Sequence, residues 1–247
     1  MIIQNKIEYI VEWIKSYCKN SDYKPTSLII GVSGGIDSAV TSTLCAKTNM
    51  KTIAVSMPIK QNKSQHDLSI KHLSWLETKF TNVTTSIIDL NSVFDSFTKS
   101  LNKHNNLLAL ANSKSRLRMT TLYQIAQSNK GIVVGTGNKV EDFGVGFFTK
   151  YGDGGVDISP IADCNKSEIW EIGKKLFILK EIINAEPTDG LWEDSRNDED
   201  QLGLTYNQIE EAMNNPLSKY YEKYESIRKK NLHKMKSIPV CKFKEDN

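Results

Sequence analysis

Residues 31–40 read Gly-Val-Ser-Gly-Gly-Ile-Asp-Ser-Ala-Val, and they follow an apolar run at 27–30 that is typical of a buried strand. The residues from Ser38 to Lys47 are typical of a helix. A glycine turn between a strand and a helix favours phosphate binding. The glycine backbone can approach an anion, and the N–H groups and positive dipole end of the helix face it. The hydroxyls of Ser33 and Ser38 add donors. The segment therefore predicts an α/β fold with an anion site after its first strand.

The loop differs from two common nucleotide-binding motifs. It lacks the lysine of Gly-x-x-x-x-Gly-Lys-Ser/Thr, and it does not match Gly-x-Gly-x-x-Gly. Asp37 stands instead where a carboxylate could hold Mg²⁺ against phosphates. The string Ser-Gly-Gly-x-Asp-Ser resembles the pyrophosphate loop of the ATP-pyrophosphatase superfamily, whose members split ATP between the α- and β-phosphates and adenylate a substrate. The alternative is an ordinary strand-to-helix turn built from small residues.

Further strands and helices alternate along the chain. Apolar and β-branched runs predict strands near 52–57, 83–88 and 131–135. Helical spacing or composition predicts helices over the ranges 2–18, 68–80, 91–101 and 106–128. This alternation predicts a doubly wound parallel sheet with helices on both faces. Ligands bind such sheets at the carboxyl ends of the strands, so the loop at 33–38 and the residues after Gly135 are expected to share one site.

The second half of the chain is less regular. Residues 136–165 are rich in glycine and aspartate, and so long an irregular stretch is usually functional. We expect helix again near 166–184 and two helices within 205–230, separated by Pro216. The polar segments 60–66 and 189–201 are expected to be mobile loops. Residues 1–247 are interpreted as a single domain with a small helical C-terminal portion.

Composition excludes several classes of protein. No apolar run approaches the about 18 residues of a membrane span, and the N-terminus lacks the regions of a signal peptide. Four widely separated cysteines are most simply reduced thiols of a cytoplasmic protein. A net charge of +3 is too small to indicate a nucleic-acid partner. We therefore expect a cytoplasmic protein that binds neither membrane nor nucleic acid.

A second group of motifs suggests a family. Residues 147–157 read Phe-Phe-Thr-Lys-Tyr-Gly-Asp-Gly-Gly-Val-Asp, and residues 135–141 read Gly-Thr-Gly-Asn-Lys-Val-Glu. With the segments 112–119 and 187–192 and with His233-Lys234, they resemble the ammonia-dependent NAD synthetases over nearly the whole chain. The resemblance implies a ligase that adenylates deamido-NAD with ATP, releasing pyrophosphate, and then forms NAD and AMP with ammonia. This is the last step of NAD biosynthesis.

The resemblance also implies roles at the ATP end. Asp37 and Glu141 are expected to bind Mg²⁺, and Lys166 and Thr188 to contact phosphate. Taken alone, Glu141 and Lys166 could be surface residues. The full expected ATP site consists of Gly31, Val32, Ser33, Gly34, Gly35, Asp37, Ser38, Met57, Ser64, Thr136, Lys166 and Thr188, with Gln65 as a further adenine-pocket candidate. Asp37 and Lys166 are counted among the catalytic residues.

Other residues are implied at the deamido-NAD end. Asp153 is the third expected catalytic residue, because a carboxylate near the ammonia site can bind ammonium and accept its proton. The alternative is an aspartate that bonds its own turn. The expected deamido-NAD contacts are Arg116, Lys150, Asp157, His233 and Lys234. Phe147 and Phe148 fit either core packing or stacking on a ring.

The chain departs from the family pattern in three places. Many members read Gly-Thr-Asp-His-Ala-Ala-Glu where residues 135–141 of this chain read Gly-Thr-Gly-Asn-Lys-Val-Glu. This chain also has one extra residue before Gly146, and it therefore resembles a second bacterial variety of the family. Leu108 stands where some members have an aromatic on the nicotinate ring. No amidase domain with a cysteine nucleophile fits before the first strand, which implies free ammonia or a separate protein as the nitrogen source.

Family members are homodimers, and the 106–128 helix is an interface candidate that could equally be core. Two other functions stay open at this point. One is another adenylating synthetase of the same superfamily, acting on a nucleotide base or a tRNA. The other is a non-catalytic ATP-binding sensor. The low charge and unclustered cysteines disfavour tRNA, and the presence of Asp37, Glu141 and Asp153 disfavours the sensor.

Overall fold

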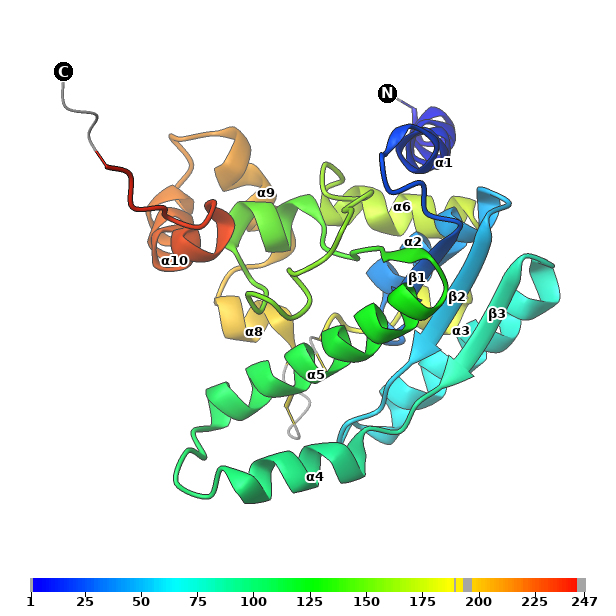
Figure 1. Cartoon of the computed structure of the whole chain (residues 1–247). Helices are drawn as coiled ribbons and strands as arrows, with labels where there is room; N and C mark the ends of the chain where they lie inside the picture. Colours follow the sequence, from blue (N-terminus) through cyan, green and yellow to red (C-terminus); the bar gives the residue numbers. More distant parts are fainter. Residues whose placement is uncertain (1, 189, 193–196, 244–247) are drawn as a thin grey trace.

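The computed structural model describes residues 2–188, 190–192 and 197–243. Four parallel strands form one sheet in the order β3-β2-β1-β4 (Figure 1). The strands are β1 (Ser27–Gly31), β2 (Lys51–Ser56), β3 (Val83–Ile87) and β4 (Gly131–Val133). Ser27 is in register with Lys51 on one side and with Gly131 on the other. The predicted parallel α/β sheet is confirmed.

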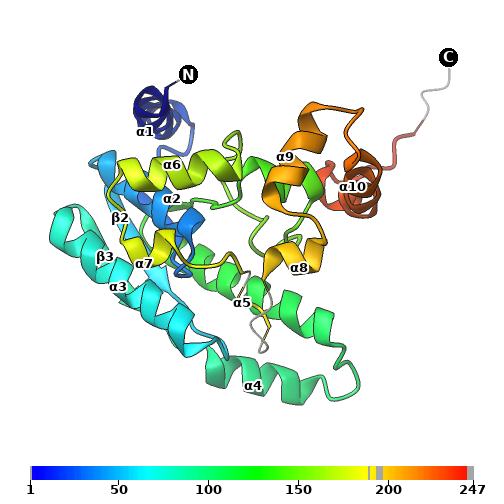
Figure 2. The ribbon, with the colours of Figure 1, turned by 180° about the vertical axis from the view of Figure 1, so that it is seen from behind.

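Helices cover both faces because successive strand side chains point to opposite sides. In β1, Leu28 and Ile30 join one core cluster and Ile29 joins another. The first cluster packs the sheet against α1 (Ile3–Asn20), α2 (Ile36–Lys47), α3 (Lys63–Lys79), α6 (Lys166–Lys175) and α7 (Lys180–Ile183), seen in Figure 2. The second packs it against α4 (Asn91–Ser100) and α5 (Leu107–Ser128), which cross the front of Figure 1.

A third cluster lies beside the sheet. It joins a π-helix, η1 (Lys139–Val145), to α9 (Tyr206–Asn214) and α10 (Tyr221–Met235). The short helix α8 (Asp198–Leu202) adds Leu202 to the same cluster. Helices α8, α9 and α10 form the helical C-terminal portion, of which the sequence predicts two helices within 205–230 (Figure 1). None of the described helices is long and apolar enough to cross a membrane.

Several element boundaries differ from the prediction. Helix α2 begins at Ile36 rather than Ser38, directly after the glycine turn. Helix α3 begins at Lys63 because the Asn62 side chain accepts the Ser64 N–H bond and caps it. Part of the expected 189–201 loop is helix α8, while Asp189 and residues 193–196 lie outside the described residues. The expected irregular stretch 136–165 contains η1.

The topology places the functional loops. From β1 the chain moves outward through β2 and β3, and it then returns to pair β4 on the other side of β1. The loops after β1 and β4 therefore diverge at a switch point, where open α/β sheets bind ligands. The loops that follow these two strands, residues 32–35 and 134–138, border this crevice.

A buried histidine makes the fold sensitive to acid. His72 is fully buried, its Nε2 lies 2.9 Å from the Ser42 hydroxyl, and burial lowers its pKa to about 4. The folded state therefore binds fewer protons than the unfolded state. The contribution of the neutral His72 to the free energy of unfolding is fully present above pH 6.5, the pKa in the unfolded state. It is lost as the pH falls toward 4. At about 1.4 kcal/mol per pH unit, the loss reaches about 3 kcal/mol.

We expect His72→Gln to flatten this pH dependence, because glutamine keeps a polar group near Ser42 but does not take up a proton. The measurement is urea unfolding at several pH values between 6.5 and 4.5. His104→Gln is the control, since His104 is exposed. An unchanged slope in His72→Gln would contradict the assignment.

Candidate nucleotide-binding active site

The loop between β1 and α2 is tightly folded around its own hydroxyls. Ser38 Oγ accepts the Ser33 N–H at 3.2 Å and donates to the Gly35 carbonyl at 3.0 Å. Gly34 has a φ of +94°, and a Cβ there would overlap the Gln65 carbonyl oxygen, so glycine is required. The N-cap residue of α2 is Gly35, which has no side chain to accept hydrogen bonds from the N–H groups of the first turn. The internal hydrogen bonds hold the loop in shape at the start of α2, where the N–H groups of the first helical turn are the donors suited to phosphate.

A lysine with two carboxylates lies behind this loop. Lys166 Nζ, from α6, donates to Asp37 Oδ2 at 2.6 Å and to Glu141 Oε1 at 2.8 Å. Lys166 is 2% exposed. Burial alone would lower the pKa of Lys166, but the charges and hydrogen bonds of Asp37 and Glu141 raise it. The ammonium therefore stays charged, and residues distant in sequence form one buried ionic group.

Two neutral residues fix this group. Asn138 Nδ2 donates to Asp37 Oδ1 at 3.0 Å, and Asn138 Oδ1 accepts the Glu141 N–H at 3.0 Å. The Tyr206 hydroxyl donates to Glu141 Oε1 at 2.6 Å, and its ring lies 4.9 Å from Lys166 Nζ. Burial raises the pKa of Tyr206, so the hydroxyl keeps its proton. Neither residue was predicted from the sequence.

The predicted magnesium ligands fit a hard cation in part. Asp37 and Glu141 contact the same nitrogen atom, so their oxygens are close enough to share one positive charge. Within the described ranges, no group of three acidic, histidine or cysteine side chains is arranged to hold a metal. Phosphates and water would supply the other ligands, as is usual for Mg²⁺ at nucleotide sites. The metal role stays a prediction.

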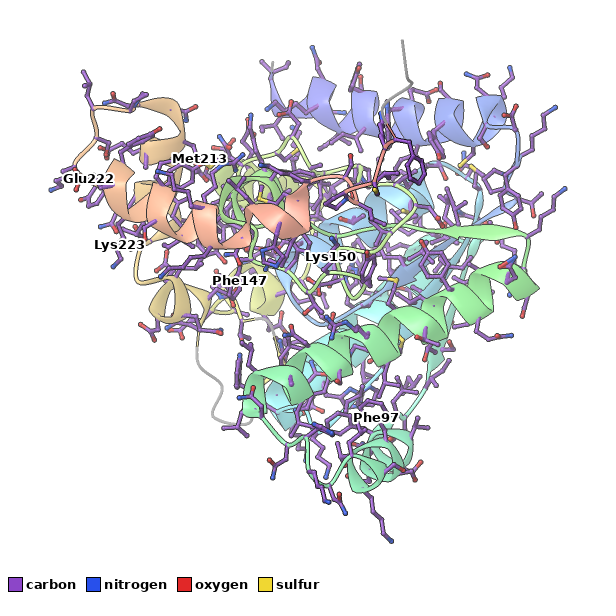
Figure 3. All side chains as sticks on the ribbon, turned by 60° about the vertical axis from the view of Figure 1, so that its left-hand side comes forward. Phe97, Phe147, Lys150, Met213, Glu222 and Lys223 are labelled. Carbon is purple, nitrogen blue, oxygen red and sulfur yellow. The ribbon has the colours of Figure 1, made fainter. Side chains whose placement is uncertain are left out.

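The opposite wall joins α5 to α10. Lys150 Nζ donates to the His233 carbonyl at 3.3 Å, and Arg116 Nε donates to the Lys150 carbonyl at 3.2 Å. Lys234 Nζ donates to the Phe148 carbonyl at 2.7 Å and lies 5.0 Å from the Phe148 ring centre. Figure 3 shows Phe147 and Lys150 between α10 and α5. Phe147 packs against the third core cluster and also lines the cavity.

Asp153 both shapes its turn and faces the cavity. Its Oδ1 accepts the Thr149 N–H at 3.0 Å and the Ser115 hydroxyl at 2.6 Å. The Ser115 hydroxyl in turn accepts the Asp153 N–H at 2.9 Å. One carboxylate oxygen therefore has the turn role that the sequence left open. The described residues donate no hydrogen bond to the other oxygen, which leaves it available to a ligand.

A further carboxylate was missed in the sequence. Asp142 lines the same cavity directly after Glu141. Burial and the negative charges of Asp153, Glu141 and Asp37 raise the pKa of Asp142 well above its usual range. The sequence feature that could have drawn attention to Asp142 is the extra residue before Gly146, because η1 spans this part of the chain.

These walls enclose a cavity of about 960 Å³, at the upper end of the range for ligand pockets. Every predicted site residue lines it except Asp157. Asp157 lies on the far side of β4, where its carboxylate accepts the Val133 N–H at 2.7 Å and the Tyr123 hydroxyl at 3.0 Å. The predicted adenine candidates Met57, Ser64 and Gln65 all face the cavity, and so does Arg118, which the sequence analysis did not single out.

The fold and this site define a nucleotide-binding α/β protein with a pyrophosphate-type loop at the switch point of its sheet. The family described as NAD synthase matches residues 6–247. An NH₃-dependent NAD⁺ synthetase from Finegoldia magna is 37% identical, with 97% of each chain covered. The chain belongs to the NAD synthase family.

Two solved structures extend the comparison. The NMN synthetase from Francisella tularensis has a TM-score of 0.90 and 32% identity, covering 98% of this chain and all of the other. The NH₃-dependent NAD synthetase from Campylobacter jejuni has a TM-score of 0.79 and 26% identity with the same coverage. The likeness includes the helical C-terminal portion as well as the sheet, because nearly the whole chain is covered.

Proposed function

We propose that this protein catalyses the ATP-dependent amidation of deamido-NAD to NAD with ammonia. The observation that carries the proposal is the Asp37–Lys166–Glu141 group behind the phosphate loop, in one cavity with Asp153. Family membership and the Finegoldia relative support it. A carboxylate cannot be amidated directly near neutral pH, because oxide is a poor leaving group. Activation by ATP removes this obstacle.

In the first step, the nicotinate carboxylate oxygen attacks the α-phosphorus of ATP. The bond to the bridging oxygen breaks, and pyrophosphate leaves. Ser33, Ser38 and the loop N–H groups bind the leaving pyrophosphate, and Lys166 offsets its negative charge. Mg²⁺, held by Asp37 and Glu141, would supply further neutralisation of phosphate charge. Arg116, Lys150, His233 and Lys234 position the dinucleotide so that two anions can meet.

In the second step, ammonia attacks the activated carbonyl carbon, and AMP leaves as the nicotinamide forms. Ammonium must lose one proton to free its lone pair, and the amine nitrogen loses another when the amide forms. Asp153 binds the cation and accepts one of these protons, and the other passes to solvent. Because water would hydrolyse the adenylate, α10 and the residues 185–188 and 190–192 beside the cavity are the parts of the described chain suited to exclude it.

The Francisella structure favours a second candidate substrate, the mononucleotide that lacks the AMP half. The amidation chemistry would be unchanged, since the same nicotinate carboxylate reacts. Deamido-NAD is the first choice because the Finegoldia relative covers the chain at higher identity. A cavity of about 960 Å³ also leaves room beyond a nucleoside triphosphate.

The test is an assay of amide formation with ATP and Mg²⁺ in four arms: deamido-NAD or nicotinate mononucleotide, each with ammonium or glutamine. We expect product with deamido-NAD and ammonium, with AMP and pyrophosphate in equal amounts. Preference for the mononucleotide would select the second candidate. No amide in any arm, while ATP still binds, would contradict both.

We further propose that the enzyme is a cytoplasmic homodimer. Leu107 and Leu108 at the start of α5 are 72% and 59% exposed, whereas Leu122 of the same helix is core. An exposed apolar helix end favours contact with a second copy. Cys18, Cys45 and Cys164 are buried thiols without disulfides, which fits a reducing compartment.

We expect Asp37→Asn to raise the Mg²⁺ concentration needed for half-maximal pyrophosphate release and to slow that release about 10- to 100-fold. The loss corresponds to one charge-assisted contact of about 1.5–3 kcal/mol. Asparagine keeps an oxygen for Lys166, so the fold should persist. Asp22→Asn, an exposed position, is the control. An unchanged rate at limiting Mg²⁺ would remove Asp37 from the metal site.

A further inference from the structure

Asp142 has no part in the steps above, although it faces the same cavity as Glu141. Consecutive side chains of an α-helix diverge by about 100°. A π-helix has more residues per turn, so neighbouring side chains diverge less, and such segments are frequent at functional sites. Residues 139–145 form a π-helix. It therefore directs two consecutive carboxylates at one cavity.

Gly137 provides the space for Asp142. A Cβ on Gly137 would overlap the Asp142 carboxylate, which occupies the volume that a side chain at position 137 would take. The neighbouring Thr136 also lines the cavity. In the part of the chain that the structure describes, no group donates a hydrogen bond to the Asp142 carboxylate. Its oxygens are acceptors that a ligand can use.

The charges around Asp142 select the kind of ligand. Asp153, Glu141 and Asp37 line the same cavity and surround Asp142 with negative charge, and Lys234 is a cation of that lining that acts on it. Lys166 already pairs with Glu141 and Asp37, so Asp142 and Asp153 remain as two acids facing one lysine. In the proposed reaction, ATP and the dinucleotide are anions, and ammonium is the cationic substrate.

We propose that Asp142 binds, together with Asp153, the ammonium ion that supplies the amide nitrogen. The inference rests on the proposed function and adds a second carboxylate to its amine site. Ammonium has N–H donors on all sides, which suits oxygen acceptors from two carboxyl groups, and its positive charge offsets the negative charges that surround Asp142 in the free protein. Asp142 makes and breaks no covalent bond in this role.

The experiment compares the two half-reactions in the full-length enzyme and Asp142→Asn. Pyrophosphate release without ammonium reports adenylation, and amide formation against ammonium chloride concentration reports the second step. We expect the KM for ammonium to rise about 10- to 100-fold in Asp142→Asn. We expect pyrophosphate release to stay within about twofold of the wild type, with an unchanged Mg²⁺ requirement.

Gly137→Ala is the second variant, because its methyl group displaces the carboxylate without removing its charge. A flexible side chain can move aside, so this variant tests the proposal even if Asp142→Asn folds poorly. It should raise the KM for ammonium as well. Asp163→Asn, whose side chain is 94% exposed, is the matched control and should behave as wild type.

Three results would overturn the proposal while leaving the proposed function intact: an unchanged KM for ammonium in both variants, a raised Mg²⁺ requirement in its place, or equal losses in both half-reactions. A wild-type enzyme that forms no amide from ammonium would instead refute the proposed function, and this inference would fall with it.

Discussion

Lys166→Met is expected to slow pyrophosphate release about 10²- to 10³-fold, the usual cost of removing a preorganised electrostatic contact. The substitution keeps most of the side-chain volume but removes the ammonium that contacts Asp37 and Glu141. Two carboxylates, 17% and 15% exposed, then lie close together with no opposite charge between them. Removing one partner of a buried ion pair costs about 3–5 kcal/mol of folding free energy. For a chain of this length, that lowers the Tm by roughly 6–20 °C.

The Tm of Lys166→Met measured with and without Mg²⁺ tests whether this ionic group binds a cation or only stabilises the fold. If Asp37 and Glu141 can hold a divalent cation, added Mg²⁺ should recover part of the lost Tm in Lys166→Met, because the two carboxylates are then unpaired. The wild type should show a smaller response in the absence of ATP, since Lys166 already offsets one of their two negative charges. Lys174→Met, an exposed lysine of the same helix, is the control. A Lys166→Met variant with normal Tm and normal pyrophosphate release would show that the buried ionic group is dispensable.

The ionic group also shows what the sequence could predict. The phosphate loop with Asp37 and the strand pattern follow from local motifs and periodicity, whereas Glu141 and Lys166 were predicted only from the resemblance to the family. The mutual contact of these three residues follows from neither, because it depends on how α6 packs against α2. Tyr206 had no local signal at all, since it reaches Glu141 only through the packing of α9 on η1.

Asp157 and Asp142 also show that local sequence does not reveal which side chains line the cavity. Asp157 belongs to the family motif but does not line the cavity, because its carboxylate bonds the Val133 N–H beside the bridge between Val134 and Ile158. Asp142 was passed over because the sequence around it has no periodic pattern, and the cavity lining shows that it lies beside Glu141 in one site, on the π-helix. Local pattern therefore identifies the motif, and long-range packing decides which of its side chains reach the site.

Asp153→Asn is expected to slow amide formation about 10²- to 10⁴-fold, the range for loss of a general base, while pyrophosphate release continues. The substitution is well matched to the turn. The Asn Oδ1 can still accept the bonds from Thr149 N–H and the Ser115 hydroxyl. It replaces Oδ2, the carboxylate oxygen to which the described residues donate no hydrogen bond, with an amide nitrogen that repels ammonium and accepts no proton. The dinucleotide adenylate should therefore accumulate and be detectable by mass spectrometry after rapid quenching.

Ser115→Ala provides the complementary variant. It removes a hydroxyl that both donates to Asp153 Oδ1 and accepts the Asp153 N–H, yet it leaves the carboxylate charge in place. If Asp153 contributes mainly by holding the shape of the 149–153 turn, Ser115→Ala should impair amide formation as strongly as Asp153→Asn. If its charge and proton affinity matter, Ser115→Ala should be the milder of the two, and Asp153→Asn alone should trap the adenylate. Parallel loss of pyrophosphate release and amide formation in Asp153→Asn would place this carboxylate outside the ammonia step.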